Sequence, residues 1–318
     1  MRVLITGITG FVGSHLADHI LEEHPEVEIF GLKRWRSPRE NIEHIKDKLT
    51  LYDGDLRDLS SMLSVIGEVK PDWVFHLAAQ SFVPTSFSSP ASTLATNIIG
   101  TVNLLEAIRI AEVDPKVHIC SSSECYGQVN QEEIPIKETC PLRPASPYAV
   151  SKLGEDMLAY MYYQAHGLRT IRSRAFTHTG PRRGEVFVVS SFAKQIAHIE
   201  KGIQEPVLWA GNLDSVRTFC DVRDIVRAYW LLLQRGEIGE VYNIGGRETM
   251  TIRDMLNKLL KLTDALIEVK IHENLLRPKD VTLQVPDCTK FTKLTGWEPR
   301  IPFEQTLQDT LDYWRERA

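Results

Sequence analysis

A tyrosine and a lysine four residues apart, Tyr148 and Lys152, are the two side chains of this chain best suited to chemistry. A spacing of four residues puts both on one face of a helix, so the ammonium group can lie beside the phenol. A neighbouring cation favours the phenolate and lowers the pKa of the tyrosine, which would let it exchange a proton with a hydroxyl or ketone near neutral pH. The pair alone also fits an ordinary exposed helix, so other motifs must decide.

Three glycines near the beginning of the chain predict a dinucleotide-binding loop. Residues 2–5 have the apolar character of a buried strand, and the segment TGITGFVGSHLADHIL after it has the pattern of a turn and an amphipathic helix. Three glycines in this context allow a tight turn, close approach to a pyrophosphate and close packing of helix on strand, whereas a simple turn needs only one. The residues of the expected cofactor loop are Gly7, Thr9, Gly10, Phe11, Val12 and Gly13.

The residues after the second expected strand, 27–32, favour NADP over NAD. A site that prefers NAD usually has an acidic residue here, which bonds the ribose hydroxyls. Residues 33–37 instead read KRWRS, and their cations suit a ribose phosphate. We therefore assign Lys33 and Arg34 to the cofactor. The alternative is a solvated basic loop.

A third apparent strand covers residues 49–52 and is followed by Asp55 and Leu56. A carboxylate at this place can accept a hydrogen bond from an adenine amino group. We therefore count Asp55 and Leu56 among the expected cofactor contacts.

Composition and charge narrow the class of protein. The chain of 318 residues has 43% apolar residues and a formal net charge of −5, with its basic residues dispersed rather than gathered into a nucleic-acid-binding patch. No apolar run approaches the ~20 residues of a membrane span, and the N-terminus reads as a strand rather than a signal peptide. Five cysteines without a CxxC pair indicate neither a disulfide framework nor a zinc site. We expect a cytoplasmic enzyme without a metal, a membrane or a nucleic-acid partner.

Apolar strand-like runs alternate with helical stretches along the first half of the chain, which favours a parallel sheet covered by helices on both faces. We expect an α/β fold with a Rossmann-type doubly wound sheet. Residues 1–176 plus about 214–246 would form the NADP-binding Rossmann domain. Residues about 177–213 plus 247–318 would form a smaller, mixed lobe that binds a nucleotide sugar.

Several motifs occur in the order typical of one superfamily: GxxGxxG, HLAAQS (76–81), NIIGT (97–101), SSSECYG (121–127) and YxxxK. Over nearly its whole length, the chain resembles the extended short-chain dehydrogenase/reductase superfamily. The resemblance implies that Tyr148 is the catalytic acid/base, Lys152 its partner and Ser122 the catalytic Ser/Thr. It also implies homodimers through a helix bundle. Further residues that it places at the site are Leu77, Ala78 and Ala79 for the cofactor and Asn97 on the proton path.

Within that superfamily, the chain is most similar to enzymes that act on GDP-mannose and its 4-keto-6-deoxy product. This similarity rests on the segments GPRRGEVFV (180–188), GNLDSVR (211–217) and LRPKDV (276–281). It implies a GDP-sugar substrate, whose diphosphate suits bidentate arginines. The implied substrate contacts are Ser81, Lys194, Arg217, Arg277 and Asp280.

The segments KRWRS, SSSE and PRRGE look more like a GDP-mannose 4,6-dehydratase, whereas SFAKQIAHIE, DVRDIVRAYWLL and GWEPRIPFE look more like the related reductase. The dehydratase reaction needs a base for carbon 5 besides the residues that handle hydride transfer, and Glu124 would be this base, although related reductases also carry Glu at the matching place. Tyr148 would take the proton from the hydroxyl on carbon 4, and Glu124 would take the proton from carbon 5 as water leaves carbon 6. The dehydratase resemblance also raises homotetramers, with the basic loop 34–39 as a contact rather than a cofactor clamp.

Three alternatives stay open. The first is an NADPH-dependent reductase of GDP-4-keto-6-deoxymannose, which needs Ser122, Tyr148 and Lys152 but no carbon-5 base. The second is a dehydratase of another GDP-hexose or GDP-heptose, because Thr177-His178 stands where the family usually has Asn-His; we assign His178 no role. The third, from another class, is a non-catalytic NADP-binding protein.

Overall fold

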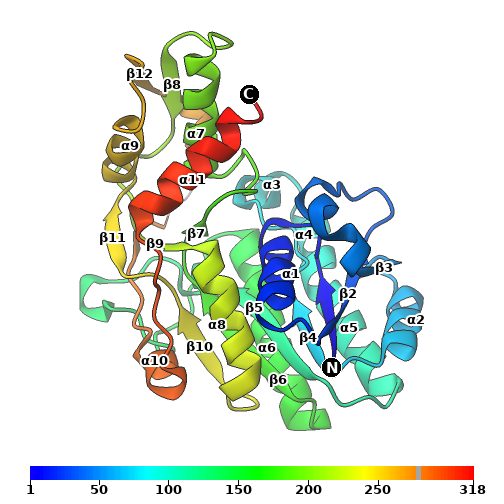
Figure 1. The fold of residues 1–318 in the computed structure, drawn as a ribbon. Helices are drawn as coiled ribbons and strands as arrows, with labels where there is room; N and C mark the ends of the chain where they lie inside the picture. Colours follow the sequence, from blue (N-terminus) through cyan, green and yellow to red (C-terminus); the bar gives the residue numbers. More distant parts are fainter. Residues whose placement is uncertain (277–280) are drawn as a thin grey trace.

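The computed structural model describes residues 1–276 and 281–318, and a parallel sheet of seven strands lies at the centre of this part of the chain (Figure 1). The order of its strands is β10-β6-β5-β4-β1-β2-β3, and every neighbouring pair is parallel. This order confirms the predicted Rossmann-type sheet. The strands are β1 (Arg2–Thr6), β2 (Glu28–Lys33), β3 (Thr50–Asp53), β4 (Trp73–His76), β5 (Lys116–Ser122), β6 (Thr170–Ala175) and β10 (Val241–Ile244).

Helices cover both faces of the sheet, as buried parallel strands require. The helices α1 (Phe11–Glu23) and α8 (Val222–Arg235) lie side by side on one face and share an apolar core that contains Ile5, Leu16 and Tyr229 (Figure 1). On the other face, a second core contains Val74 and Leu104. The helices of that face are α2 (Leu59–Val69), α5 (Gly100–Ile110) and α6 (Pro147–His166).

The helix expected over 97–111 has an irregular start. Residues Ala95–Ile99 form a π-type turn between the short helix α4 (Pro90–Leu94) and α5. A π turn widens the helix by one residue and often marks a functional site. Here it contains Asn97, whose buried side chain bonds outside the helix.

A smaller group of elements, mostly from the second half of the chain, has a core of its own, which includes Phe192, Met255 and Leu307. In Figure 1 these elements gather at one end of the sheet. Its strands are β7 (His178–Thr179), β8 (Val207–Ala210), β9 (Val216–Asp221), β11 (Glu248–Thr251), β12 (Glu268–Ile271) and β13 (Leu283–Gln284). Its helices are α7 (Val188–Glu200), α9 (Ile252–Leu260) and α11 (Phe303–Arg315). The helix α10 (Thr289–Thr295) lies apart from them, beside β10, and its Phe291 packs in the core that α1 and α8 share. None of the described helices is both long and apolar enough to cross a membrane.

Two glycines of the N-terminal loop are required by close backbone approach. Gly7 has a positive φ of 73°, and a Cβ there would lie 2.9 Å from the backbone of Ala78. Gly13 lies in the first turn of α1, where a Cβ would overlap the carbonyl oxygen of Gly7. The helix can therefore reach the end of β1 only without a side chain at these positions.

We expect Gly13→Ala to lower the free energy of unfolding by about 2 kcal/mol or more, because the methyl group must displace the Gly7 backbone. The matched control is Gly67→Ala in α2, where a Cβ would meet nothing within 4 Å. That change should instead raise stability by about 0.5–1 kcal/mol, the helix-propensity difference. Urea unfolding of both variants measures these differences. Equal effects would contradict the packing argument.

Candidate active site

The ends of β1 and β4 are joined by one hydroxyl group. Thr6 Oγ1 accepts hydrogen bonds from the backbone N–H groups of Leu77 (3.1 Å) and Ala78 (3.2 Å) and lies 2.9 Å from His76 Nδ1. Ala79 follows directly. The predicted cofactor residues from the glycine loop and from the HLAAQS motif are therefore brought together at the carboxyl edge of the sheet, where ligands of such folds bind.

The glycine loop presents the N-terminus of α1. Gly10 donates its N–H to the carbonyl of Gly7 (2.9 Å) and precedes the helix without a side-chain cap. The carbonyl of Thr9 accepts a hydrogen bond from Asn41 (3.1 Å). Phe11 and Val12 begin the helix and pack partly against the core. The uncapped N–H groups of this first turn suit a phosphate group.

Some of the charged side chains at the ends of β2 and β3 form ion pairs with each other. The ammonium group of Lys33 is buried and bonds the Asp53 carboxylate, whereas Arg34 is exposed. Arg57 bonds both carboxylate oxygens of Asp55 (3.1 and 2.6 Å) and lowers the pKa of Asp55. Of the two predicted cofactor cations, Arg34 is thus the one that faces solvent.

Leu56, the other predicted cofactor contact after β3, packs against the start of α5. It is buried, and a Cβ on Gly100 at the start of α5 would lie 2.9 Å from its Cβ.

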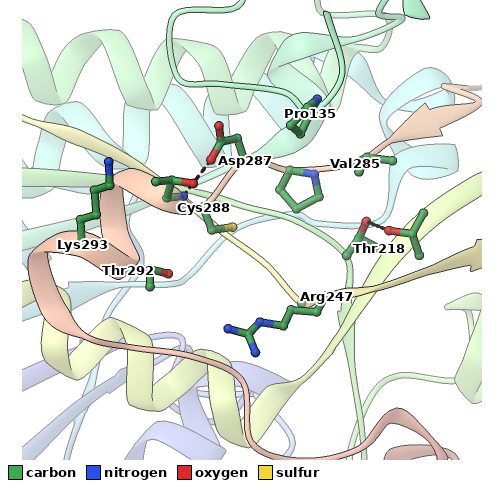
Figure 2. A pocket seen from close by; sticks show the side chains of 12 residues that line it. Pro135, Thr218, Arg247, Val285, Asp287, Cys288, Thr292 and Lys293 are labelled. Carbon is green, nitrogen blue, oxygen red and sulfur yellow. Dashed lines mark hydrogen bonds between the residues drawn. The ribbon is translucent and has the colours of Figure 1, made fainter.

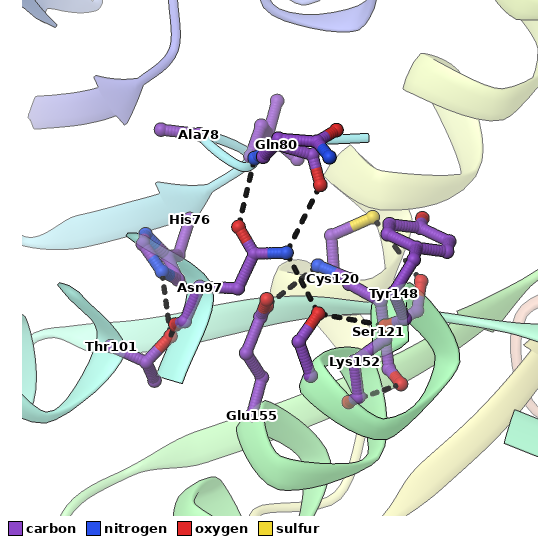
Figure 3. A network of polar contacts seen from close by, with 12 residues as sticks. His76, Ala78, Gln80, Asn97, Thr101, Cys120, Ser121, Tyr148, Lys152 and Glu155 are labelled. Carbon is purple, nitrogen blue, oxygen red and sulfur yellow. Dashed lines mark hydrogen bonds and ion pairs between the residues drawn. The ribbon is translucent and has the colours of Figure 1, made fainter. Parts of the chain in front are cut away.

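A buried asparagine joins the cofactor side to the helix that carries Tyr148 (Figure 3). The side chain of Asn97 accepts from the N–H of Gln80 (2.8 Å), donates to the carbonyl of Gln80 (3.0 Å) and donates to Ser151 Oγ (2.8 Å). Ser151 in turn donates to the carbonyl of Tyr148 (2.7 Å). All the polar groups of the Asn97 amide are used, so its orientation is fixed.

Tyr148 and Lys152 lie in the first two turns of α6, whose N-cap is Ser146. Burial raises the pKa of Tyr148 to about 12, although the charge of Lys152 and a hydrogen bond with Ser122 act to lower it. Lys152 thus lowers the pKa of the phenol, as expected from the spacing, but the larger effect of burial outweighs it. The opposing effect, desolvation, depends on three-dimensional packing.

Ser122 is the last residue of β5, and Glu124 lies in the turn that follows it. Ser122 Oγ accepts from the N–H of Glu124 (3.2 Å) and lies within hydrogen-bonding reach of the Tyr148 phenol. Glu124 is partly buried in a short 3-10 turn, Ser123–Tyr126. The structure thus brings together Ser122, Tyr148 and Lys152, and the backbone of Glu124 bonds the Ser122 hydroxyl two residues before it.

The segment 180–187 contacts both α1 and α7. The carbonyl of Pro181 lies 2.9 Å from His15 Nε2, and Arg182 donates to Asp18 (2.6 Å). This segment therefore connects the glycine-loop helix to the helix that begins the smaller group of elements.

Arg183 was not singled out in the sequence, although the PRR doublet contains it. Its guanidinium lies 3.6 Å from the ring centre of Phe187 and 4.8 Å from that of Phe11. Burial lowers the pKa of Arg183 to about 10, and the nearby Tyr148 phenol opposes that change. The ring of His178 stacks on that of Phe11. Burial, and to a smaller extent the positive charge of Arg183, lowers the pKa of His178 to about 4. The sequence feature that could have pointed to Arg183 is the pair of arginines directly before Gly184.

The predicted substrate contacts come from several elements. Ser81 is exposed before the helix α3 (Val83–Ser88). Lys194 on α7 pairs with Glu185, and Arg217 on β9 is buried, donating to the carbonyl of Val216 (3.0 Å). Arg277 and Asp280 lie outside the described residues.

A hollow of about 450 Å³ lies elsewhere, between the β10–β11 connection and the start of α10 (Figure 2). Thr218, Arg247, Asp287 and Lys293 are among its lining residues, and none of the predicted site residues lines it. It is therefore separate from the Tyr148 cluster.

The sheet order, the glycine loop and the Ser-Tyr-Lys cluster define a dinucleotide-binding protein of the dehydrogenase/reductase type. The family model for GDP-mannose 4,6 dehydratase matches residues 4–310, and the chain belongs to this family.

Individual relatives include both enzymes named in this family. The chain is 33% identical to GDP-6-deoxy-D-mannose reductase from Pseudomonas aeruginosa, over 100% of this chain and 98% of the relative. It is also 33% identical to GDP-mannose 4,6-dehydratase from Yersinia enterocolitica, over 96% and 91% of the two chains. The solved structure of RMD from Pseudomonas aeruginosa complexed with NADPH superposes with a TM-score of 0.86 at 32% identity, covering 100% of this chain and 99% of that one.

Two buried histidines make stability depend on pH. Burial, followed by the charge of Lys152, lowers the pKa of His76 and of His118 to about 3. Unfolded histidines titrate near pH 6.5, so below this pH the unfolded state binds more protons and stability is lost as pH falls, by about 1.4 kcal/mol per pH unit for each histidine. We expect the free energy of unfolding of His118→Leu to fall less steeply between pH 6.5 and 5 than that of the wild type, by about that amount per unit. Equal slopes in urea titrations would contradict this expectation.

Proposed function

We propose that the protein is an NADP-dependent GDP-mannose 4,6-dehydratase, which forms GDP-4-keto-6-deoxymannose by internal hydride transfer. The observation that carries this proposal is the position of Glu124, two residues after Ser122, whose hydroxyl lies within reach of the Tyr148 phenol. A dehydratase needs an acid/base at carbon 4 and a separate base for carbon 5, and these side chains supply both. The family match supports the same reaction class.

In the proposed reaction, the chain's own residues move the protons. Tyr148 accepts the proton of the hydroxyl group on carbon 4, while Ser122 bonds the same oxygen and holds it in place. Glu124 removes the proton from carbon 5, which the carbon-4 ketone has made acidic, and passes this proton to the hydroxyl group of carbon 6, which leaves as water. Carbon 6 then receives the hydride, and return to carbon 5 of the proton that Tyr148 took completes the 4-keto-6-deoxy sugar. When bound, NADP supplies the hydride acceptor and then the donor, so no external reductant is consumed.

The residues at the edge of the sheet fit such a cofactor. A Cβ at Gly7 or Gly13 would fill the turn that the pyrophosphate approaches, and the first turn of α1 has no side-chain cap. We assign the ribose phosphate to Arg34, the exposed cation of the predicted pair, with Lys33 held beneath it by Asp53. The NADPH complex of the superposed Pseudomonas structure supports NADP over NAD.

The second candidate function is the NADPH-dependent reductase of the 4-keto-6-deoxy sugar. The observation that favours it is the identity of 33% over 98% of the length of the Pseudomonas reductase, equal to that of the Yersinia dehydratase. Its chemistry would use Ser122, Tyr148 and Lys152 and leave Glu124 without a role in proton removal.

We also propose that the smaller group of elements binds the GDP part of the substrate, with Lys194 and Arg217 near its phosphates.

For the assembly, we propose a homodimer or homotetramer. Large apolar side chains exposed on α5 and α6 support this assembly: Ile110, Val150, Met157, Tyr160 and Met161.

We expect the purified protein to convert GDP-mannose with catalytic NADP and no added NADPH, measured as loss of water by mass spectrometry. Glu124→Gln should lower the rate at least ~100-fold, since general base catalysis typically contributes 10²–10⁴-fold. Glu132→Gln, an exposed acid nearby, is the matched control and should retain activity. NADPH oxidation with the ready-made keto sugar, without dehydration of GDP-mannose, would identify the reductase instead.

We expect Arg34→Ala to weaken NADP binding about 10- to 100-fold, because one charge-assisted contact to the ribose phosphate contributes about 1.5–3 kcal/mol. NAD lacks this phosphate, so its affinity should change little. Arg39→Ala removes the same charge from the same exposed loop and serves as the control. Isothermal titration calorimetry with both dinucleotides measures the effect. Equal losses for NAD and NADP would rule out the assignment.

A further inference from the structure

Lys152 shares its buried position with a carboxylate on its own helix. Lys152 Nζ donates to Glu155 Oε2 at 2.6 Å, three residues further along α6 (Figure 3). The two side chains are only 6% and 1% exposed. The ammonium group assigned to the Tyr148 phenol therefore has a negative charge beside it.

The second oxygen of this carboxylate has no hydrogen-bond partner among the described residues. Glu155 Oε1 is buried and unbonded, so the ionised form of Glu155 is only half satisfied. Burial raises the pKa of Glu155 to about 7, although Lys152 acts in the opposite direction. Geometry and electrostatics thus both favour uptake of a proton by Glu155 near neutral pH.

Histidines, a cysteine and a further ion pair also face this pair. The histidines of β4 and β5 have a pKa lowered to about 3, mainly by burial. Burial raises the pKa of Cys120 above its ordinary value, so its thiol stays neutral. On α6 itself, the Asp156 carboxylate bonds Arg172 and Arg174 on β6, each at 2.8 Å. Within this described cluster, Glu155 is the group whose charge can switch.

We propose that Glu155 is a positioning residue that sets the proton affinity of Tyr148 by acting on Lys152. Ionised Glu155 holds the ammonium group and cancels part of its field at the phenol, which favours the protonated tyrosine. Protonated Glu155 leaves the full charge of Lys152 to stabilise the phenolate. The inference deepens the proposed function, because it assumes that Tyr148 is the acid/base.

This arrangement couples two titrations. As pH rises, Glu155 ionises first and makes the later ionisation of Tyr148 harder, so the two steps are pushed apart. Removing the Glu155 charge should therefore lower the pH at which Tyr148 ionises.

The test uses the full chain labelled with fluorotyrosine and observed by ¹⁹F NMR, without turnover. Fluorination makes phenols more acidic, which brings the titration below strongly alkaline pH, and Tyr148→Phe identifies the resonance. We expect the Tyr148 midpoint in Glu155→Gln to lie roughly 0.5–1 pH unit below that of the wild type. The wild-type resonance should also shift near pH 7, and Glu155→Gln should lose this step. Glu43→Gln, which removes the i,i+3 partner of Lys46 at the surface, should change neither.

An unchanged or higher Tyr148 midpoint in folded Glu155→Gln would overturn the proposal. If that variant does not fold, the wild-type spectrum still decides, because absence of the step near pH 7 would overturn it as well. Since the readout needs no substrate, failure of this inference is distinguishable from failure of the proposed dehydratase activity.

Discussion

The amide of Asn97 is the interaction on which the site depends. It bonds the backbone of Gln80 on one side and Ser151 of α6 on the other. These bonds hold the helix that carries Tyr148 at a fixed position relative to the carboxyl edge of the sheet. The amide is buried, and a lost partner there would leave polar groups without water, which costs more than an ordinary hydrogen bond contributes. The π-type turn at Ala95–Ile99 is the distortion that lets this side chain reach both partners.

Helix α6 carries two ion-pair arrangements with buried carboxylates. Asp156 is shared by two arginines of β6, while Lys152 and Glu155 form a single pair. The first arrangement satisfies both carboxylate oxygens and fixes the helix to the strand. The second leaves one oxygen unbonded and is therefore the less stable ion pair. The Asp156 ion pairs, which hold the helix to the strand, and the Lys152–Glu155 pair, which is only partly satisfied, thus involve adjacent residues of α6.

The sequence predicted the local features well because they depend on neighbours along the chain. The glycine loop, the alternation of strands and helices and the shared helical face of Tyr148 and Lys152 follow from periodicity and turn chemistry. Contacts set by packing were not predictable: Lys33 turns inward to Asp53, and Arg183 inserts between two phenylalanine rings. The raised pKa of Tyr148 belongs to the same class, since residue spacing reveals a neighbouring cation but not how much water is excluded. Residue roles in catalysis stay predictions.

The segment 180–187 physically links the two parts of the molecule, so substitutions in one part affect the other. Pro181 and Arg182 bond side chains of α1, and Phe187 precedes the first turn of α7. A substitution at His15 or Asp18 of α1 therefore changes the surface against which the segment leading into α7 is anchored. A change on one side of this contact is therefore expected to need a compensating change on the other. Recombination that exchanges the smaller half between relatives would have to carry the outer face of α1 with it.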